Sequence, residues 1–325
     1  MVCAAAGVLV VTAQFQPKAT LRDRRSIWLV ALYVGLQMAT AVAAPPALPS
    51  ASLATAPAAG ASLRAQYTAM QVELAQSEFL QPLVVRSEEG QGNIVGEVFA
   101  VVDFSLTQVI QGLDSPQRWC DIMILHINTK YCSAKPGPQG MQLAVHIGKK
   151  TPENLVYTRP LVLNYLPHNL GPDYLNIGLM AKEGPIGTSD YEILLEAVAL
   201  PGDRSFLHLS YSYKVNMMGK LALQTYLGTA GRNKVGFSVV QRNAVGQPVL
   251  MGGVRGVVER NTMRYYLAIN AYLAAERLPP QERQEARLLN WIVATERYPL
   301  QLQEVDRASY LTMKRAELLR QQTTR

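Results

Sequence analysis

The sequence predicts an α+β fold that combines a curved antiparallel sheet with one long helix late in the chain. Apolar and polar residues alternate in several segments between residues 93 and 249, as in strands with one buried face. Breaks rich in Gly and Pro separate these segments and indicate turns. Residues 257–275 contain no Gly or Pro and have apolar residues at helical spacing. Further helices are expected after this long one.

The N-terminal region has the order of a secretory signal peptide. Residues 21–25 are basic, residues 27–36 are apolar, and residues 41–43 are small. We therefore expect cleavage near Ala43 and a periplasmic location in a Gram-negative-type bacterium. One alternative is an uncleaved inner-membrane anchor facing the periplasm, although the apolar run is short for a membrane span. A twin-arginine signal is another alternative. A second apolar segment, residues 4–13, suggests a start site assigned too far upstream.

Composition limits the classes of partner. At 49 % hydrophobic and 17 % charged residues, the 325-residue chain can bury a substantial core. The net charge is +7, and the cations in residues 1–43 leave about +4 for the remainder. No basic stripe is interleaved with aromatic residues, so nucleic acid is not an expected partner. A weak attraction to an anionic membrane surface remains open.

Two of the three cysteines are predicted to pair. Cys3 lies in the predicted leader, whereas Cys120 and Cys132 lie in the body of the chain. In an oxidising compartment such a pair forms a disulfide by default, which stabilises the fold by about 3 kcal/mol for so short a loop. Two buried thiols are the alternative. No metal site is expected, because the four histidines show no ligand spacing with the cysteines.

The chain divides into four predicted parts. Residues 1–43 form the signal peptide, and residues 44–61 are a disordered Ala/Pro linker. Residues 62–277 form the ligand-binding domain, which begins with an amphipathic helix over 62–79. Residues 278–325 form a solvated C-terminal helical appendage.

Within the domain, one short helix and a series of strands are expected before the long helix. A strand over 93–102 precedes an N-cap at 103–105 and a helix over 105–113. A loop is expected between the two cysteines. The later elements are strands over 141–147, 155–163, 174–181, 191–200, 206–215 and 234–242, a helix over 217–227, and two final helices over 281–295 and 302–322. Residues 243–246 are expected to close a hairpin from the strand over 234–242 to residue 249.

This order of elements resembles the START-like (SRPBCC, helix-grip) superfamily. The resemblance rests on residues 93–113, the alternating strands of 141–249 and the helix over 257–275. It implies that the sheet wraps around the long helix and leaves a cavity for a lipid, sterol or other apolar molecule. The helix over 217–227 and the helices after residue 280 depart from the simple pattern of this superfamily.

Candidate ligand-binding residues lie on the strand over 206–215, on the long helix and beside the first cysteine. Arg260 and Arg264 are one helical turn apart and are suited to a carboxylate or phosphate group. The alternative is a salt bridge from either arginine to Glu192 or Glu196. Tyrosine hydroxyls suit the few polar positions of an apolar pocket, although ordinary core packing is the alternative. The other candidates are Trp119, Tyr211, Tyr213, Tyr265, Ala268 and Tyr272.

No catalytic motif stands out. The glycines of 252–256 lack the Lys-Ser/Thr ending of a phosphate-binding loop, and the histidines are isolated. We therefore expect an exported carrier of a lipid or other hydrophobic molecule, without a cofactor. One alternative is an enzyme of the same superfamily that acts on an apolar substrate. The other is an envelope interaction protein that docks through its C-terminal helices.

Overall fold

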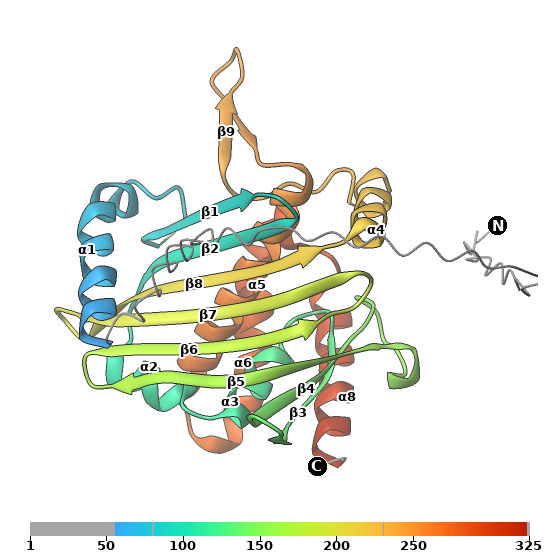
Figure 1. The fold of residues 1–325 in the computed structure, drawn as a ribbon, viewed down its shortest axis with the longest axis horizontal. Helices are drawn as coiled ribbons and strands as arrows, with labels where there is room; N and C mark the ends of the chain where they lie inside the picture. The colour runs from blue at the N-terminus through green and yellow to red at the C-terminus, as the bar shows by residue number, and fades with distance from the viewer. Residues whose placement is uncertain (1–55, 80, 230, 324–325) are drawn as a thin grey trace, which may run out of the picture. The chain divides into compact units, whose positions relative to one another are not determined.

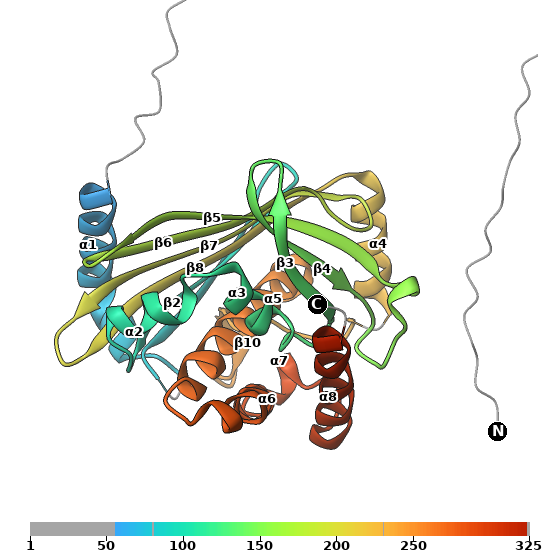
Figure 2. The ribbon, with the colours of Figure 1, turned by 90° about the horizontal axis from the view of Figure 1, so that it is seen from below.

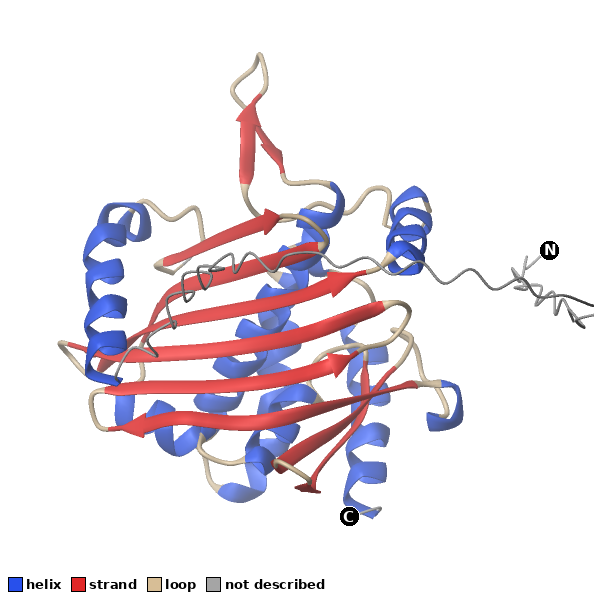
Figure 3. Cartoon of the chain, in the orientation of Figure 1, coloured by secondary structure: helices blue, strands red, loops and turns tan. Residues whose placement is uncertain are grey.

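The computed structural model describes residues 56–79, 81–229 and 231–323. The predicted signal peptide and most of the predicted linker lie outside these residues. Within them, an antiparallel sheet is covered by helices, and a small hairpin projects from one side (Figures 1 and 3). The predicted α+β class with an antiparallel sheet is therefore confirmed.

The sheet has eight strands in the order β1-β2-β8-β7-β6-β5-β4-β3, and all neighbours are antiparallel. From β3 to β8 the strands follow one another as a meander, and β2 then pairs with β8 along its whole length. The strands are β1 (Leu83–Glu89), β2 (Asn93–Val102), β3 (Thr129–Gly137), β4 (Gly140–Ile147), β5 (Arg159–Gly171), β6 (Tyr174–Glu183), β7 (Thr188–Leu200) and β8 (Arg204–Val215).

Alternation along the strands gives the sheet one inner and one outer face. On β8, the predicted inward series Leu207, Leu209, Tyr211 and Tyr213 is buried. The intervening side chains, such as His208, are only partly buried and lie on the outer face. This is the period-2 pattern that the sequence predicted.

The long helix α5 (Gly253–Ala275) crosses the inner face of the sheet, as the helix-grip prediction requires (Figures 1 and 2). It passes close to β2 because Gly96 has no side chain, and a Cβ there would collide with Thr262. Two short helices, α2 (Leu106–Leu113) and α3 (Pro116–Met123), pack beside it on the same face. Ser105 and Gln108 form a capping box at the start of α2.

Several predicted boundaries are wrong. The segment between the cysteines is only partly a loop, because it also contains the last residues of α3 and the start of β3. The N-cap Ser115 followed by Pro116 was the overlooked helix signal. The helix α5 begins four residues before the predicted start. The predicted strand over 155–163 begins instead with a 3-10 turn (Leu155–Tyr157), because the Asn154 side chain caps that turn.

Two elements lie between β8 and α5. The helix α4 (Met217–Gly228) confirms the helix predicted over 217–227. The hairpin predicted to close through residues 243–246 is present, but its first strand is the short β9 (Val239–Arg242), which pairs with β10 (Pro248–Leu250), and not a strand over 234–242. The buried carboxylate of Glu259 on α5 holds the hairpin base, because it accepts hydrogen bonds from the Phe237 and Ser238 N–H groups.

The C-terminal helices are not the solvated appendage that the sequence predicted. They are α6 (Pro280–Glu296), α7 (Pro299–Leu302) and α8 (Arg307–Thr323). Trp291 and Tyr310 are buried and stack with ring centroids 4.9 Å apart. The indole of Trp291 donates to the carbonyl of Arg264, and the Tyr310 hydroxyl donates to the carbonyl of Leu125. These helices therefore share the main core. The division of the chain at residue 278 stays a prediction.

The helix α1 (Ala56–Ala75) lies on the outer face of the sheet. Its predicted apolar positions Leu63, Met70 and Leu74 are buried in a second core against Phe99 and Phe206. It begins six residues earlier than the predicted domain, so residues 56–61 are helical rather than part of a disordered linker. Among the described residues, no helix has the length and hydropathy of a membrane span.

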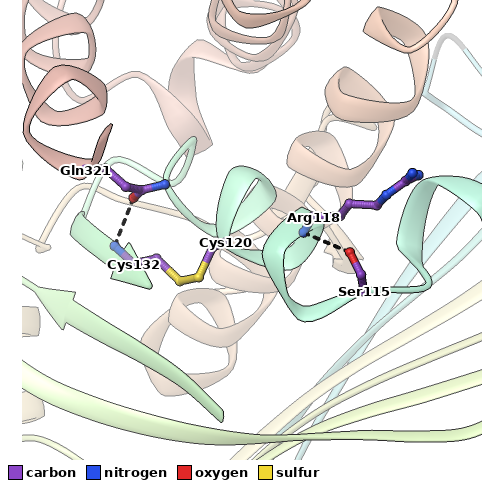
Figure 4. The surroundings of a disulfide bond; sticks show 5 residues. All are labelled: Ser115, Arg118, Cys120, Cys132 and Gln321. Carbon is purple, nitrogen blue, oxygen red and sulfur yellow. Dashed lines mark hydrogen bonds between the residues drawn. A yellow bond between two sulfur atoms is a disulfide. The ribbon is translucent and has the colours of Figure 1, made fainter. Parts of the chain in front are cut away.

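The predicted disulfide is present. Cys120 on α3 and Cys132 on β3 are bonded, with their Cα atoms 5.2 Å apart (Figure 4). The Cys132 N–H also donates to the side chain of Gln321 on α8, at 3.0 Å. Disulfide and hydrogen bond together join α3, the edge strand β3 and α8.

Candidate functional site

Four tyrosines form a cluster between the sheet and α5. Tyr191 of β7 stacks on Tyr213 of β8, with ring centroids 5.3 Å apart. Tyr211 of β8 meets Tyr265 of α5 at 5.4 Å and Tyr213 at 5.5 Å. We call Tyr191, Tyr211, Tyr213 and Tyr265 the tyrosine cluster. The structure thus brings together three predicted site residues and one that the prediction omitted.

The tyrosine cluster is neutral at physiological pH. Burial raises the pKa of each of the four hydroxyls above its usual value of 10. The hydroxyls therefore remain protonated and can donate hydrogen bonds. A lining of neutral aromatic rings with a few hydroxyls suits an apolar molecule better than a strongly polar one.

Arg260 is a buried cation without a carboxylate partner. Its side chain is on α5 and the residue is 2 % exposed. The guanidinium donates to the carbonyl of Val235 at 3.3 Å and to the hydroxyl of Tyr226 at 3.4 Å, both long distances to neutral acceptors. In the part of the chain that the structure describes, no carboxylate lies within ion-pair distance of Arg260. An unpaired charge is costly to bury, and a bound anion at this position would reduce that cost.

Arg264, one turn along α5, does have a carboxylate partner. It forms a buried ion pair of 2.8 Å with Glu304, which also contacts Lys150 at 2.8 Å. Burial acts to raise the pKa of Glu304, but the charges of Arg264 and Lys150 hold it below its usual value. The alternative predicted salt bridges to Glu192 or Glu196 are wrong, because the partner comes from the C-terminal segment.

Positive charge therefore exceeds negative charge at this end of α5. We call Lys150, Lys234, Arg260 and Arg264 the cation cluster. The charges of Lys150, Lys234 and Arg264 act on the carboxylate of Glu304, and Arg260 lies close enough to Arg264 to repel it. Lys234 also donates to the carbonyl of Gln303 at 2.6 Å. Glu259, which precedes Arg260 in the sequence, is held instead by Ser87 and the base of the hairpin. Lys150 and Lys234 are partly exposed, so the cluster extends from the core to the surface.

His126 adds a buried hydrogen-bond donor beside the tyrosine cluster. Its ring stacks on Tyr265 at 4.9 Å. Burial, reinforced by the charge of Arg264, lowers the pKa of His126 well below 6.5, so the ring is neutral at pH 7. Nδ1 accepts from the Asn128 N–H at 3.2 Å, which assigns the ring hydrogen to Nε2. No described protein atom accepts from His126 Nε2 or from Arg264 Nε.

The remaining predicted site residues lie outside the tyrosine cluster and pack in the core of the protein. Ala268 is fully buried on α5, one turn after Arg264. Tyr272 is two turns beyond Tyr265, about 10 Å along the axis, and packs under the Arg287 guanidinium at 4.2 Å. Trp119 is buried on α3 and donates to the carbonyl of Leu113. Their predicted role in ligand binding therefore stays a prediction, without support from the tyrosine cluster.

A hollow lies under α4, at the same end of the fold. Its volume is about 170 Å³. The lining combines the β1–β2 turn, the end of β8, one face of α4 and the start of α5, and consists of Glu89, Gly90, Gly92, Ile94, Val215, Lys220, Leu223, Gln224 and Val254. Leu223 and Val254 also pack against the main core. The helix α4 therefore covers one side of this hollow.

Sequence reasoning missed several members of the site. Tyr191 shares a face with Ile193 and could have been found from strand alternation. Tyr226, Lys150 and Glu304 could not, because they approach α5 from a separate helix and from irregular segments. In the described residues, no cluster of three or more His, Cys, Asp or Glu side chains could hold a metal ion.

Comparison with known proteins finds similarity of fold only. No protein-family model matches the chain, and no curated protein matches it. Similar solved structures include Zhui aromatase/cyclase from Streptomyces sp. R1128, with 14 % identity over 63 % of this chain and 94 % of that chain and a TM-score of 0.31. Human StAR-related lipid transfer protein 5 has 10 % identity over 52 % of this chain and 90 % of its own, with a TM-score of 0.29.

A third similar structure is norcoclaurine synthase from Thalictrum flavum, with 13 % identity, coverage of 48 % of this chain and 92 % of that chain, and a TM-score of 0.30. All three have START-type folds. The helix-grip arrangement of this chain rests on its own antiparallel sheet and the helix α5 that crosses it. Scores this low carry no argument about activity. The function has to be argued from the site itself.

Proposed function

We propose that this chain binds an apolar molecule carrying one anionic group, between β7, β8 and the N-terminal half of α5. The observation that carries the proposal is Arg260, a guanidinium that is 2 % exposed and has only neutral, distant acceptors. A carboxylate or phosphate oxygen would supply the missing countercharge, and the planar fork of arginine suits either group.

Other donors support an anionic group at this position. The charge of Arg264 is only partly used by Glu304, because its Nε has no described acceptor. The Nε2–H of His126 is likewise available beside Tyr265. The guanidinium of Arg260, Arg264 Nε and His126 Nε2 are therefore three buried donors near the N-terminal half of α5, and of these three residues Arg264 is the one paired with a carboxylate in the described part of the chain. Pairing them with a ligand anion would remove a desolvation cost.

The tyrosine cluster supports an apolar body for the same ligand. Its rings extend from β7 across β8 to α5, so a molecule held at Arg260 would lie against aromatic surface. Burial of apolar surface would drive binding. Because Tyr211 and Tyr265 are in contact, the rings have to separate when a ligand enters. Binding is therefore coupled to movement, and α4, which covers the neighbouring hollow, is the element that admits the ligand.

The carrier role is the finer form of this proposal. A disulfide between Cys120 and Cys132 is typical of an oxidising compartment and supports export. A carrier needs to bind and release its ligand without changing it. His126 favours this over the enzyme alternative, since its neutral ring presents Nε2–H as a donor and not as a base.

The docking alternative has less support. The apolar faces of α6 and α8 are occupied by Trp291, Tyr310 and their neighbours in the core. Deletion of these helices would also remove Glu304, the partner of Arg264. Ligand binding and partner docking would therefore fail together in such a deletion, and point variants are the better test.

The test is native mass spectrometry of protein purified from its own compartment, with lipid extraction, followed by titration with a long-chain fatty acid. Arg260→Met should reduce fatty-acid affinity at least tenfold, because the charge-assisted bond is lost. The control is Arg315→Met, which removes an exposed arginine paired with Glu285 and should leave affinity unchanged.

A neutral analogue of the fatty acid distinguishes binding of the anionic group at Arg260 from binding of the apolar body at the tyrosine cluster. The corresponding fatty alcohol should bind the native chain weakly, and Arg260→Met should not weaken it further. Equal affinity of native protein and Arg260→Met for the fatty acid would overturn the role of Arg260. A purified chain that neither carries nor binds any apolar molecule would overturn the proposal as a whole.

A further inference from the structure

Residues 204–258 are unusual in charge. They contain seven cations and no Asp or Glu, and they span β8, α4, the hairpin and the start of α5. Some of these cations are used internally or paired, for example Arg255 with Ser87 and Lys214 with Asp190. In the described part of the chain, Lys220 on α4 and Arg232 just after it have no carboxylate within ion-pair distance. Both are exposed.

The outward side of α4 is apolar. Met217, Met218 and Leu221 are between 65 % and 87 % exposed, and Ile186 in the β6–β7 turn is 59 % exposed. The turn and the helix are joined, because the Asn216 N–H donates to the carbonyl of Gly187 at 2.9 Å. We call Ile186, Met217, Met218 and Leu221 the α4 patch. Large apolar side chains gathered in this way on a surface indicate an interaction site.

Ile186 has a backbone conformation that is unusual for its residue type. Its φ of 55° lies in the left-handed region, which β-branched residues rarely adopt. Asp or Asn would adopt this conformation more readily, and either would place a polar side chain at this exposed position. An exposed isoleucine held at such a position adds to the patch at a cost in backbone energy.

From these observations we infer that the α4 patch docks the chain on an anionic lipid bilayer. The apolar side chains insert at the level of the headgroups, and Lys220 and Arg232 contact lipid phosphates. This combination of an apolar helix face with flanking cations is the one that interfacial helices use. The inference stands on surface exposure and charge, and does not need the proposed ligand.

A bilayer fits the patch better than a protein partner does. A stable protein interface buries about 800 Å² on each side, with some 20 or more residues. The α4 patch has four large side chains, on one helix and one turn, far fewer than such an interface needs. A bilayer needs only a few inserted side chains, and anionic headgroups complement the unpaired cations.

The position of α4 gives docking a consequence for the site. Lys220, Leu223 and Gln224 of α4 line the hollow, and the hydroxyl of Tyr226 on the same helix accepts from Arg260. Docking through the patch would place the hollow against the membrane surface. An anionic amphiphile could then pass between bilayer and protein without crossing water.

The test uses the full chain with a tryptophan in the patch. Met218→Trp is the reporter, and Val72→Trp, at a residue 69 % exposed on α1, is the matched control. Vesicles of phosphatidylcholine mixed with phosphatidylglycerol, some with brominated acyl chains, are added to each variant. Both variants also carry Trp28→Phe, because Trp28 lies in the apolar N-terminal residues and would report on their contact with vesicles. The other native tryptophans, Trp119 and Trp291, are buried.

We expect a blue shift and bromine quenching for Met218→Trp, and neither for Val72→Trp. Vesicles of phosphatidylcholine alone should give a much smaller effect. No response of Met218→Trp, or equal responses of both reporters, would overturn the inference. A response of Met218→Trp to a protein in an extract, without a response to vesicles, would also overturn it.

Charge reversal tests the cations separately. Lys220→Glu/Arg232→Glu should lower vesicle affinity of the Met218→Trp reporter at least tenfold, because each basic residue near an anionic surface contributes about 1 kcal/mol. Lys135→Glu/Arg159→Glu changes the net charge equally, at exposed residues of β3 and β5, and should have a much smaller effect. If the two double variants lost equal vesicle affinity, the effect would come from long-range attraction between the net charge and the anionic surface. That result would contradict docking through α4. Thermal unfolding confirms that each variant is folded.

Discussion

His208 and Arg260 are both largely buried cationic side chains, but His208 has two carboxylate partners from neighbouring strands and Arg260 has none among the described residues. On the outer face, His208 donates to Glu196 at 3.0 Å and to Glu97 at 2.9 Å, across three adjacent strands. Although burial alone would lower the pKa of His208, the two carboxylates raise it to about 9. On the inner side, Arg260 has only a carbonyl and a hydroxyl as acceptors.

The difference separates a structural group from a candidate binding group. The Glu97, His208 and Glu196 side chains satisfy one another, and Phe99 stacks on the imidazole at 4.5 Å. Removing the histidine would harm the fold. Removing Arg260 would relieve a buried charge, so its presence is better explained by a ligand than by stability.

The largest effect is expected from His208→Leu. Without the imidazolium, Glu97 and Glu196 face each other with no cation between them, which should destabilise the fold by about 2–3 kcal/mol. Urea unfolding measures the change. His168→Leu, at an exposed position of β5, is the control and should change stability by about 0.5 kcal/mol or less. Equal stability of His208→Leu and native protein would show that the outer network is not structural.

The next largest effect is a pH dependence. The folded pKa of His208, about 9, is above its unfolded value of 6.5, so its stabilisation is complete below pH 6.5 and is lost as pH rises through 9. Burial lowers the pKa of Lys314 from 10.5 to about 8, so this residue makes the fold more stable as pH rises above 8 and has little influence below it. Between pH 6.5 and 8 the native protein should lose about 1–2 kcal/mol, and His208→Leu should not. Parallel curves for the two proteins would contradict the raised pKa.

A smaller effect of opposite sign is expected at Arg260. Arg260→Met keeps most of the side-chain volume and removes the buried charge, so the ligand-free fold should gain about 1 kcal/mol. Chemical unfolding of delipidated protein gives the value, with Arg315→Met as control. A loss of 2 kcal/mol or more would show that Arg260 is structural, like His208, and would weaken the comparison.

The smallest effect concerns His126. Because its folded pKa lies well below 6.5, its stabilisation is present above pH 6.5 and is lost as pH falls below that value. Over the half pH unit below 6.5, His126→Gln should flatten this acid limb by less than about 1 kcal/mol, while leaving the limb at higher pH unchanged. Comparing acid unfolding of the two proteins tests this. An unchanged acid limb would mean that the buried imidazole does not titrate in this range.

Much of the fold could be predicted from the sequence, since β8, α2 and α5 follow periodic patterns of apolar residues. The strand order could not, because β2 pairs with a strand more than a hundred residues away and no local pattern encodes that pairing. The burial of α6 and α8 was missed although both helices carry recognisable apolar stripes, the second of which contains Tyr310, because their many charged residues favoured a solvated position.

The candidate site was only partly predictable. Arg260, Arg264 and Tyr265 were found because a helix start concentrates them, and Tyr211 and Tyr213 because they alternate on one strand. Which arginine has a carboxylate partner depended on Glu304, which lies in an irregular segment between α7 and α8. The histidines were all interpreted as structural. That interpretation suits His208, but His126 presents a donor without a described acceptor.

The pairing of β2 with β8 also has a consequence for how the chain folds. Glu97 and His208 are 111 residues apart, so the sheet can close only after a large loop has been brought together. Until then, the tyrosine face of β8 and the apolar face of β2 have no stable cover. Contacts with so large a sequence separation slow folding and prolong the time during which apolar surface is open to other chains. The interior that we assign to a ligand is therefore among the last parts of the molecule to form.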